Sequence, residues 1–150
     1  MNKTRVLFLC THNSARSQMA EGFLRKLGGE RFEVFSAGTE ATRVHPLAIE
    51  AMNELKIDIS GQHSKTLDRY RGQQFDYVIT VCDRANEQCP IFPDDPVRIH
   101  WSFNDPSAAT GDQAARLEVF RRVRDEIQGR IRTLVTLAER DHRAKRRSHV

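Results

Sequence analysis

The chain has 150 residues, of which 39% are hydrophobic and 29% are charged, with a formal net charge of +4. This length is enough to bury one substantial core, which predicts a single domain. No apolar run approaches the roughly 18 residues of a membrane span, and Val6–Leu9 is too short for the core of a signal peptide. We therefore expect a cytoplasmic protein that makes no membrane contact.

The positive charge is concentrated at the carboxyl end of the chain. Residues 140–150 contain five Lys or Arg and one Asp, which account for the whole net charge and leave residues 1–139 electrically balanced. We predict a folded domain over residues 1–139 and a basic, disordered tail over residues 140–150. A basic end without aromatic residues is usually solvated, so we expect no specific nucleic-acid partner. The balanced body predicts a monomer.

Strand and helix patterns alternate along the chain. Short apolar runs rich in β-branched or aromatic residues indicate strands, and apolar positions three or four residues apart indicate helices. In chain order these patterns predict strand 6–9, helix 17–27, strand 32–35, helix 46–55, strand 75–81, strand 97–101 and a helix from 117 to 134. The predicted fold class is α/β, a single-domain three-layer sandwich with a four-stranded parallel sheet flanked by helices. In such folds ligands bind beyond the carboxyl ends of the strands.

The loop after the first predicted strand carries the strongest chemical signal. It reads Cys10-Thr-His-Asn-Ser-Ala-Arg16-Ser17 and leads directly into a helix. Backbone amides of such a loop converge on an anion, and the residues expected to bind it are Thr11, His12, Asn13, Ser14, Ala15, Arg16 and Ser17. The Arg16 guanidinium can hold two oxygens of a tetrahedral anion. The same positive field favours the thiolate of Cys10, which predicts a nucleophile that attacks a bound oxyanion.

The chain has two further cysteines, Cys82 and Cys89. An odd number of cysteines without an export signal argues for reduced, reactive thiols rather than for structural disulfides. Cys82 ends the third predicted strand and should therefore lie on the same sheet edge as Cys10. The alternative is that Cys82 is a small core residue and Cys89 a surface residue. Their spacing matches no usual zinc-ligand pair, so we expect no metal.

Together these motifs resemble the low-molecular-weight tyrosine phosphatase superfamily and, within it, the thioredoxin-coupled arsenate reductases. The resemblance covers nearly the whole chain, and the cysteine pair selects the reductase branch. The matching segments are Val6–Cys10 with Asn13-Ser14, Arg16–Gly22, Ser36–Gly38, Val81-Cys82 with Cys89-Pro90, His100-Trp101 and Asp105-Pro106.

The resemblance implies a reaction and its partners. Cys10 attacks arsenate, for which phosphate and sulfate compete, and Asp105 protonates the departing oxygen. Cys82 then releases arsenite by attacking the sulfur of Cys10, and Cys89 delivers the disulfide to thioredoxin. Thioredoxin would supply the electrons, so no resident cofactor is expected, and the activity would serve arsenic detoxification.

The sequence departs from the family pattern in two places. His12 and Ala15 stand where relatives often have Gly and Cys, and we assign His12 no catalytic role. Lys65 aligns with a carboxylate through which some relatives bind potassium, so we hypothesise that Lys65 is a built-in cation near Asn13, Glu21 and Ser36.

The first alternative function is a phosphatase that uses Cys10, Arg16 and Asp105 alone. The tyrosine pair that follows Asp-Pro in such phosphatases is missing, because Ser107-Ala-Ala stands there. A non-catalytic, redox-sensitive anion-binding module is the second, and the intact set of Cys, Arg and Asp argues against it.

Overall fold

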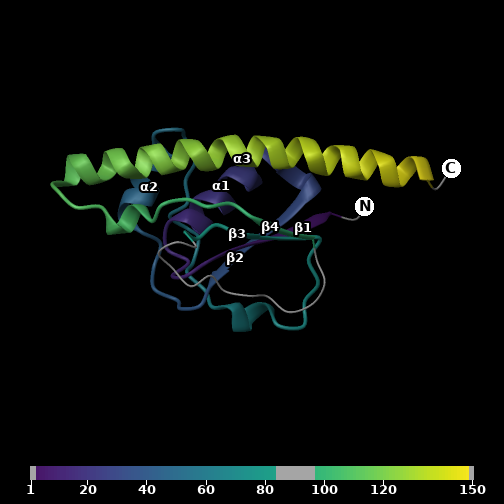
Figure 1. Cartoon of the computed structure of the whole chain (residues 1–150), viewed down its shortest axis with the longest axis horizontal. Helices are drawn as coiled ribbons and strands as arrows, with labels where there is room; N and C mark the ends of the chain where they lie inside the picture. Colours follow the sequence, from purple (N-terminus) through teal and green to yellow (C-terminus); the bar gives the residue numbers. More distant parts are fainter. Residues whose placement is uncertain (1–2, 84–96, 149–150) are drawn as a thin grey trace.

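A computed structural model of the chain describes residues 3–83 and 97–148 (Figure 1). Its helices and strands follow the predicted chain order: β1 (Thr4–Cys10), α1 (Arg16–Gly28), η1 (Gly29–Arg31), β2 (Phe32–Gly38), α2 (Pro46–Asn53), η2 (Leu67–Tyr70), β3 (Tyr77–Thr80), β4 (Val97–His100), η3 (Pro106–Ala108) and α3 (Gln113–Ser148). The three elements labelled η are short 3-10 helices.

The described strands form one parallel sheet in the order β2-β1-β3-β4. The predicted parallel sheet is thus confirmed. Strand β2 runs further than the apolar pattern indicated, because its polar and small residues as far as Gly38 continue to pair with β1. Cys10 lies opposite Gly38, and Leu9 lies opposite Thr80 of β3. The carboxyl ends of these three strands therefore meet at one edge of the sheet.

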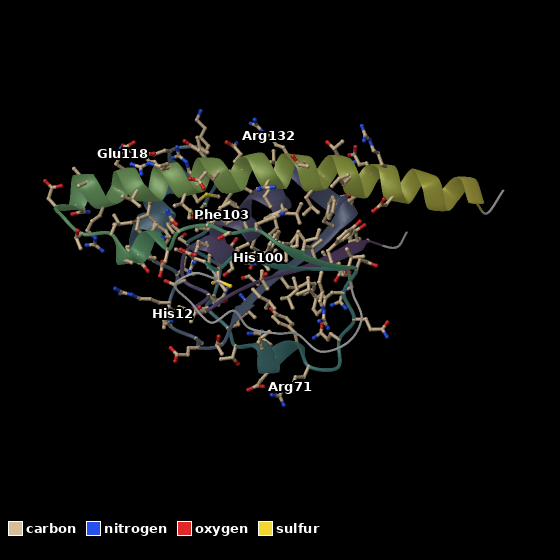
Figure 2. The ribbon with its side chains drawn as sticks, in the orientation of Figure 1. His12, Arg71, His100, Phe103, Glu118 and Arg132 are labelled. Atoms are coloured by element: carbon tan, nitrogen blue, oxygen red, sulfur yellow. The ribbon has the colours of Figure 1, made fainter. Side chains whose placement is uncertain are left out.

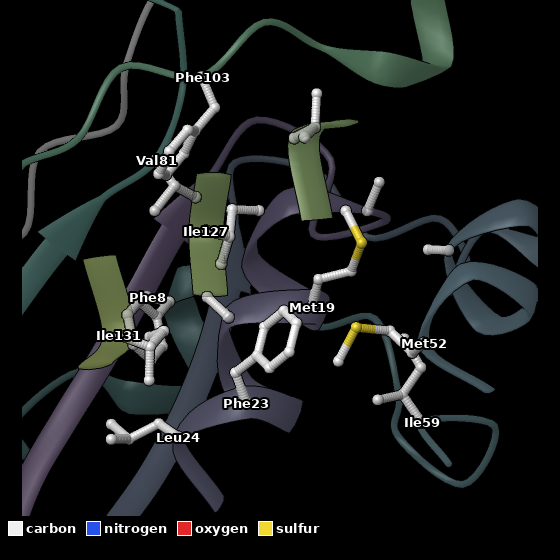
Figure 3. Packing of buried hydrophobic residues seen from close by; sticks show 14 of the residues in the cluster. Phe8, Met19, Phe23, Leu24, Met52, Ile59, Val81, Phe103, Ile127 and Ile131 are labelled. Atoms are coloured by element: carbon white, nitrogen blue, oxygen red, sulfur yellow. The ribbon is translucent and has the colours of Figure 1, made fainter. Parts of the chain in front are cut away.

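The three α-helices of the described residues gather over one face of this sheet (Figure 1). The face is lined by alternate strand residues such as Phe8 and Ile79, as expected for strands whose side chains point to opposite sides. In α3 the predicted stripe is buried as a whole, and Figure 3 shows Ile127 and Ile131 packed toward α1 and the sheet. Met19 of α1 and Met52 of α2 fill the space between these two helices.

The opposite face of the sheet has a thinner cover. Its strand residues pack against Tyr70 of η2 and against Phe75. The predicted fold class is therefore confirmed, but in the described part of the chain the third layer consists of η2 and its flanking loops. The aromatic side chains of this layer stack edge to face, with ring centroids 5.4 Å apart between Phe35 and Phe75. Large rings can cover a small face without the length of an α-helix.

Helix α3 is longer at both ends than its apolar stripe. At its start the Asp112 carboxylate accepts a hydrogen bond from the Ala115 amide (2.8 Å), which caps the first turn. At its end the backbone is helical to Ser148, so the expectation of a disordered segment from residue 140 was wrong for residues 140–148. The Asp141 carboxylate accepts a 2.6 Å hydrogen bond from the Tyr77 hydroxyl, and this contact joins α3 to β3.

Candidate active site

Cys10 is the last residue of β1 and lies at the carboxyl edge of the sheet, between β2 and β3. Only 2% of the residue is exposed. The loop of residues 11–15 follows at once, and α1 begins at Arg16. The residues predicted to bind an anion, Thr11 to Ser17, thus form this loop and the first turn of α1, as the strand–loop–helix pattern indicated.

The Cys10 sulfur has two polar neighbours from its own loop. The Asn13 amide donates to Sγ at 3.2 Å, and the Ser17 hydroxyl lies 2.8 Å from the same atom. Ser17 Oγ also accepts a hydrogen bond from Asn13 Nδ2 (2.8 Å), which leaves the hydroxyl hydrogen free to point at the sulfur. The backbone amide of one loop residue and the hydroxyl of another are thus both directed at one sulfur.

Asn13 adopts a left-handed backbone conformation with φ of 48°. Asparagine tolerates this region better than most residues, because its short polar side chain bonds locally. Here the side-chain oxygen accepts a hydrogen bond from the Lys65 amide at 2.8 Å. Asn13 is completely buried, so its conformation is held by the surrounding protein.

Arg16 and Asp105 are brought together although they lie far apart in the sequence. Arg16 is 3% exposed, and one of its terminal nitrogens lies 3.7 Å from Asp105 Oδ2. The other donates to the Phe103 carbonyl at 3.2 Å. Asp105 Oδ1 accepts hydrogen bonds from the amide (3.0 Å) and hydroxyl (2.6 Å) of Ser107, which orient the carboxylate. The predicted acid therefore lies beside the predicted anion clamp.

Backbone contacts from the segment after β2 support the loop from outside. The Glu40 amide donates to the Thr11 carbonyl (3.0 Å), and the His45 amide donates to the Ser14 carbonyl (2.9 Å). His12 points outward: its side chain is 45% exposed and its Nδ1 lies 3.4 Å from Glu40 Oε2. In Figure 2 it lies at the end of the molecule remote from the amino terminus.

Cys82 follows β3 by two residues and is completely buried. Because β3 pairs directly with β1, Cys82 lies on the sheet edge that carries Cys10, as predicted. The Val81 amide donates to the Leu9 carbonyl at 2.9 Å, so the pairing of the two chain segments continues to the residues just before both cysteines. Cys89 lies outside the described residues.

A charged cluster centred on the buried Glu21 lies behind the loop. The Glu21 carboxylate is 2% exposed and accepts a 2.5 Å hydrogen bond from the Ser36 hydroxyl. Arg25 pairs with it at 2.8 Å, and Lys65 Nζ lies 3.8 Å away. Burial lowers the pKa of Lys65, and the attraction of Glu21 opposes this effect. Lys65 therefore lies where the hypothesis of a built-in cation requires it.

Some residues that shape the site were assigned no individual role from the sequence. Gly38 packs directly against the loop: a Cβ atom there would lie 2.7 Å from the Thr11 carbonyl oxygen and 2.8 Å from the Asn13 nitrogen. Gln18 is completely buried and bonds to Asn13. Gln18 could have been noticed, because it is a polar side chain on the buried side of α1. Nothing in the sequence pointed to the Phe103 carbonyl, which accepts a hydrogen bond from Arg16.

Residues 3–83 and 97–148 contain no group of three or more His, Cys, Asp or Glu side chains arranged to hold a metal ion. Over the same residues no helix has the length and apolar character needed to cross a membrane.

Comparison with known proteins gives consistent matches over most of the chain. Residues 5–145 match the family described as low molecular weight phosphotyrosine protein phosphatase. An arsenate reductase of Halalkalibacterium halodurans is 50% identical over 133 residues, which cover 89% of this chain and 96% of that protein.

Solved structures agree with these matches. A structure described as an arsenate reductase in the phosphate binding state has a TM-score of 0.72 and 36% identity, and the match covers 89% of this chain and 97% of that one. A thioredoxin-dependent arsenate reductase of Corynebacterium glutamicum has a TM-score of 0.66 and 33% identity, with 91% of this chain and 63% of that chain covered.

Proposed function

Because the chain belongs to the low molecular weight phosphotyrosine protein phosphatase family, and within it to the arsenate reductases, we propose that it reduces arsenate through a relay of three thiols, Cys10, Cys82 and Cys89. The observation that carries the proposal is the shared sheet edge, at which Cys10 ends β1 and Cys82 follows the neighbouring strand β3 by two residues, beside a buried arginine. Arsenate reduction requires two electrons, and two thiols supply them by forming one disulfide.

In the first step Cys10 attacks arsenic as a thiolate. Arg16 and the loop amides hold the oxygens of arsenate, and an S–As bond forms while one oxygen leaves. Asp105, which lies 3.7 Å from Arg16, protonates the departing oxygen so that it leaves as water rather than as hydroxide. Phosphate and sulfate are tetrahedral oxyanions too, so they compete for the same loop.

In the second step the electron pair of the S–As bond passes to arsenic. The Cys82 thiolate attacks the Cys10 sulfur, the S–As bond breaks, and arsenic(V) becomes arsenic(III), which leaves as arsenite. The two sulfurs lose two electrons in total and form a disulfide. Cys89 then attacks the Cys82 sulfur and returns Cys10 to its thiolate form. Thioredoxin reduces the resulting Cys82–Cys89 disulfide, so the enzyme needs no resident cofactor.

Single-turnover and steady-state assays distinguish the roles of the three cysteines. Reduced enzyme without thioredoxin should form one arsenite per chain, and thioredoxin, thioredoxin reductase and NADPH should sustain turnover. Cys82→Ser should release no arsenite under either condition. Cys89→Ser should still release one arsenite per chain but lose continuous turnover. Sustained arsenate reduction by both variants would refute the relay.

Phosphatase activity is the competing function, and one observation favours it: Cys10, Arg16 and Asp105 are all in place. Hydrolysis of an aryl phosphate needs these residues and no second thiol. If Cys82→Ser hydrolyses such a substrate as fast as the unmodified chain does, and if the unmodified chain fails to reduce arsenate, the phosphatase is the correct function.

A cytoplasmic location and a monomeric state remain predictions from the sequence.

Lys65 bears on the role of cations in this reaction. Its ammonium group lies 3.8 Å from Glu21 and supplies a positive charge where a potassium ion would otherwise be attracted. We therefore expect potassium and sodium to support equal activity at constant ionic strength. A strong and selective activation by potassium would contradict this role for Lys65. Lys65→Met, which removes the charge, should weaken arsenate reduction in either salt.

A further inference from the structure

Gln18 is a polar residue in a place where an apolar one is expected. It lies in the first turns of α1 and has no exposed surface. Burying an amide without partners is unfavourable, so a buried glutamine usually has a defined set of hydrogen bonds. Here those bonds connect Gln18 to the residue that contacts the Cys10 sulfur.

The Gln18 amide nitrogen holds Asn13 from two sides. Gln18 Nε2 donates to the backbone oxygen of Asn13 at 3.1 Å and to its side-chain oxygen at 3.0 Å. It also lies 2.9 Å from the His63 carbonyl. With both of its oxygens fixed, Asn13 is kept in the left-handed conformation that directs its amide at Cys10 Sγ and its Nδ2 at Ser17.

A second glutamine fixes which way the Gln18 amide faces. Gln62 Nε2 donates to Gln18 Oε1 at 2.7 Å and to the Gln18 carbonyl at 3.0 Å. Because the oxygen of the Gln18 side chain accepts from Gln62, its nitrogen must face Asn13. The result is a chain of hydrogen bonds that runs from Gln62 through Gln18 and Asn13 to the sulfur of Cys10.

We propose that Gln18 is a positioning residue that acts through Asn13 to keep Cys10 in its thiolate form. The inference rests on the proposed function insofar as Cys10 is the nucleophile. Gln18 itself does not touch the reacting atoms. Its effect is transmitted by the Asn13 amide and by the Ser17 hydroxyl that Asn13 orients, and both lose their direction when Asn13 leaves the left-handed conformation.

The test measures the thiolate directly and does not depend on arsenate. In a Cys82→Ser, Cys89→Ser background Cys10 is the one remaining cysteine, and the ultraviolet absorbance of its thiolate can be titrated against pH. Gln18→Met has a similar shape and cannot donate a hydrogen bond. We expect its titration curve to move to higher pH by about one unit, which lowers the thiolate fraction about tenfold below the transition. Gln62→Met should move the curve in the same direction by less.

Arg124→Met is the matched control. Arg124 is another buried polar residue, and it donates to the Ala51 carbonyl (2.8 Å) and to Glu54 (2.8 Å), away from the loop. This variant should lose thermal stability and leave the titration curve of Cys10 in place. An unchanged curve in both glutamine variants, or an equal shift in Arg124→Met, would overturn the proposal. Failure of the unmodified chain to reduce arsenate would instead reject the proposed function and leave this result standing.

Discussion

Replacing Gly38 by alanine tests how closely the anion-binding loop is packed against β2. Gly38 pairs with Cys10 across the two strands, and its amide donates to the Lys65 carbonyl at 2.9 Å. A Cβ atom at this position would lie 2.7 Å from the Thr11 oxygen, 2.8 Å from the Asn13 nitrogen and 2.9 Å from the Cys10 oxygen. All three neighbours are backbone atoms of Cys10 and of the loop that follows it, so no flexible side chain can move to make room.

The expected loss of stability and activity in Gly38→Ala follows from these distances. Overpacking of a closed site typically lowers the free energy of unfolding by about 1–3 kcal/mol. For a chain of this size, each kcal/mol lowers Tm by about 2–4 °C. The loop must shift by several tenths of an ångström, and because displacement of a catalytic group by about 1 Å costs roughly 100-fold in rate, we expect a loss of at least about tenfold in kcat/KM for arsenate.

Thermal unfolding and steady-state arsenate reduction should be measured on Gly38→Ala and on Gly61→Ala. Gly61 is the matched control because a Cβ atom there meets nothing within 4 Å. We expect the control to keep the activity of the unmodified chain. If Gly38→Ala retained both full activity and full stability, the loop would be able to move away from β2 at no cost, and the reasoning from packing would be wrong.

Three further predictions concern stability. Gly129→Ala, at an open position in α3, should raise the free energy of unfolding by about 1 kcal/mol through helix propensity, measured by denaturant unfolding. Hydrogen bonds from Arg121, and then from Arg124, lower the pKa of Glu54 from 4.5 to about 2. Because the folded pKa is the lower one, this stabilisation is present above pH 4.5 and is lost as pH falls toward 2. Glu54→Gln should therefore be less stable than the unmodified chain at neutral pH, and the gap should close across that range. Burial, and then repulsion by nearby arginines, lowers the pKa of His45 from 6.5, so acid below pH 6.5 should destabilise the fold. His45→Asn, which can still cap α2, should show a smaller loss of stability in acid.

Local patterns were enough to predict the elements of this fold and the core of its site. Each strand falls on a short segment rich in apolar residues, and α3 has a continuous apolar stripe, so the hydrophobic pattern identified both. The position of the predicted anion-binding loop followed for a related reason. Its nucleophile, amides and arginine are consecutive in the chain between one strand and one helix, and this local order determines where they lie.

Contacts between distant residues were not predictable in this way. The basic composition of residues 140–150 indicates a solvated tail, so the predicted α3 was too short. The hydrogen bond from Tyr77 to Asp141 joins α3 to a segment 64 residues away, and a local pattern does not show such a contact. The placement of all three α-helices of the described residues on one face of the sheet likewise depends on how the core packs rather than on the period of any single helix.

The sequence by itself determined that Cys10 heads the predicted anion-binding loop between a strand and a helix, and that Cys82 lies at the same edge of the sheet. The tertiary structure decided how the loop is held. Gly38 leaves room for it, the Phe103 carbonyl and Asp105 engage Arg16, and Gln18 fixes Asn13. These contacts depend on distances between backbone segments, and such distances exist only when the sheet, α1 and the loops after β2 and β4 have packed together. The sequence specifies the reacting groups, and the packing sets their geometry.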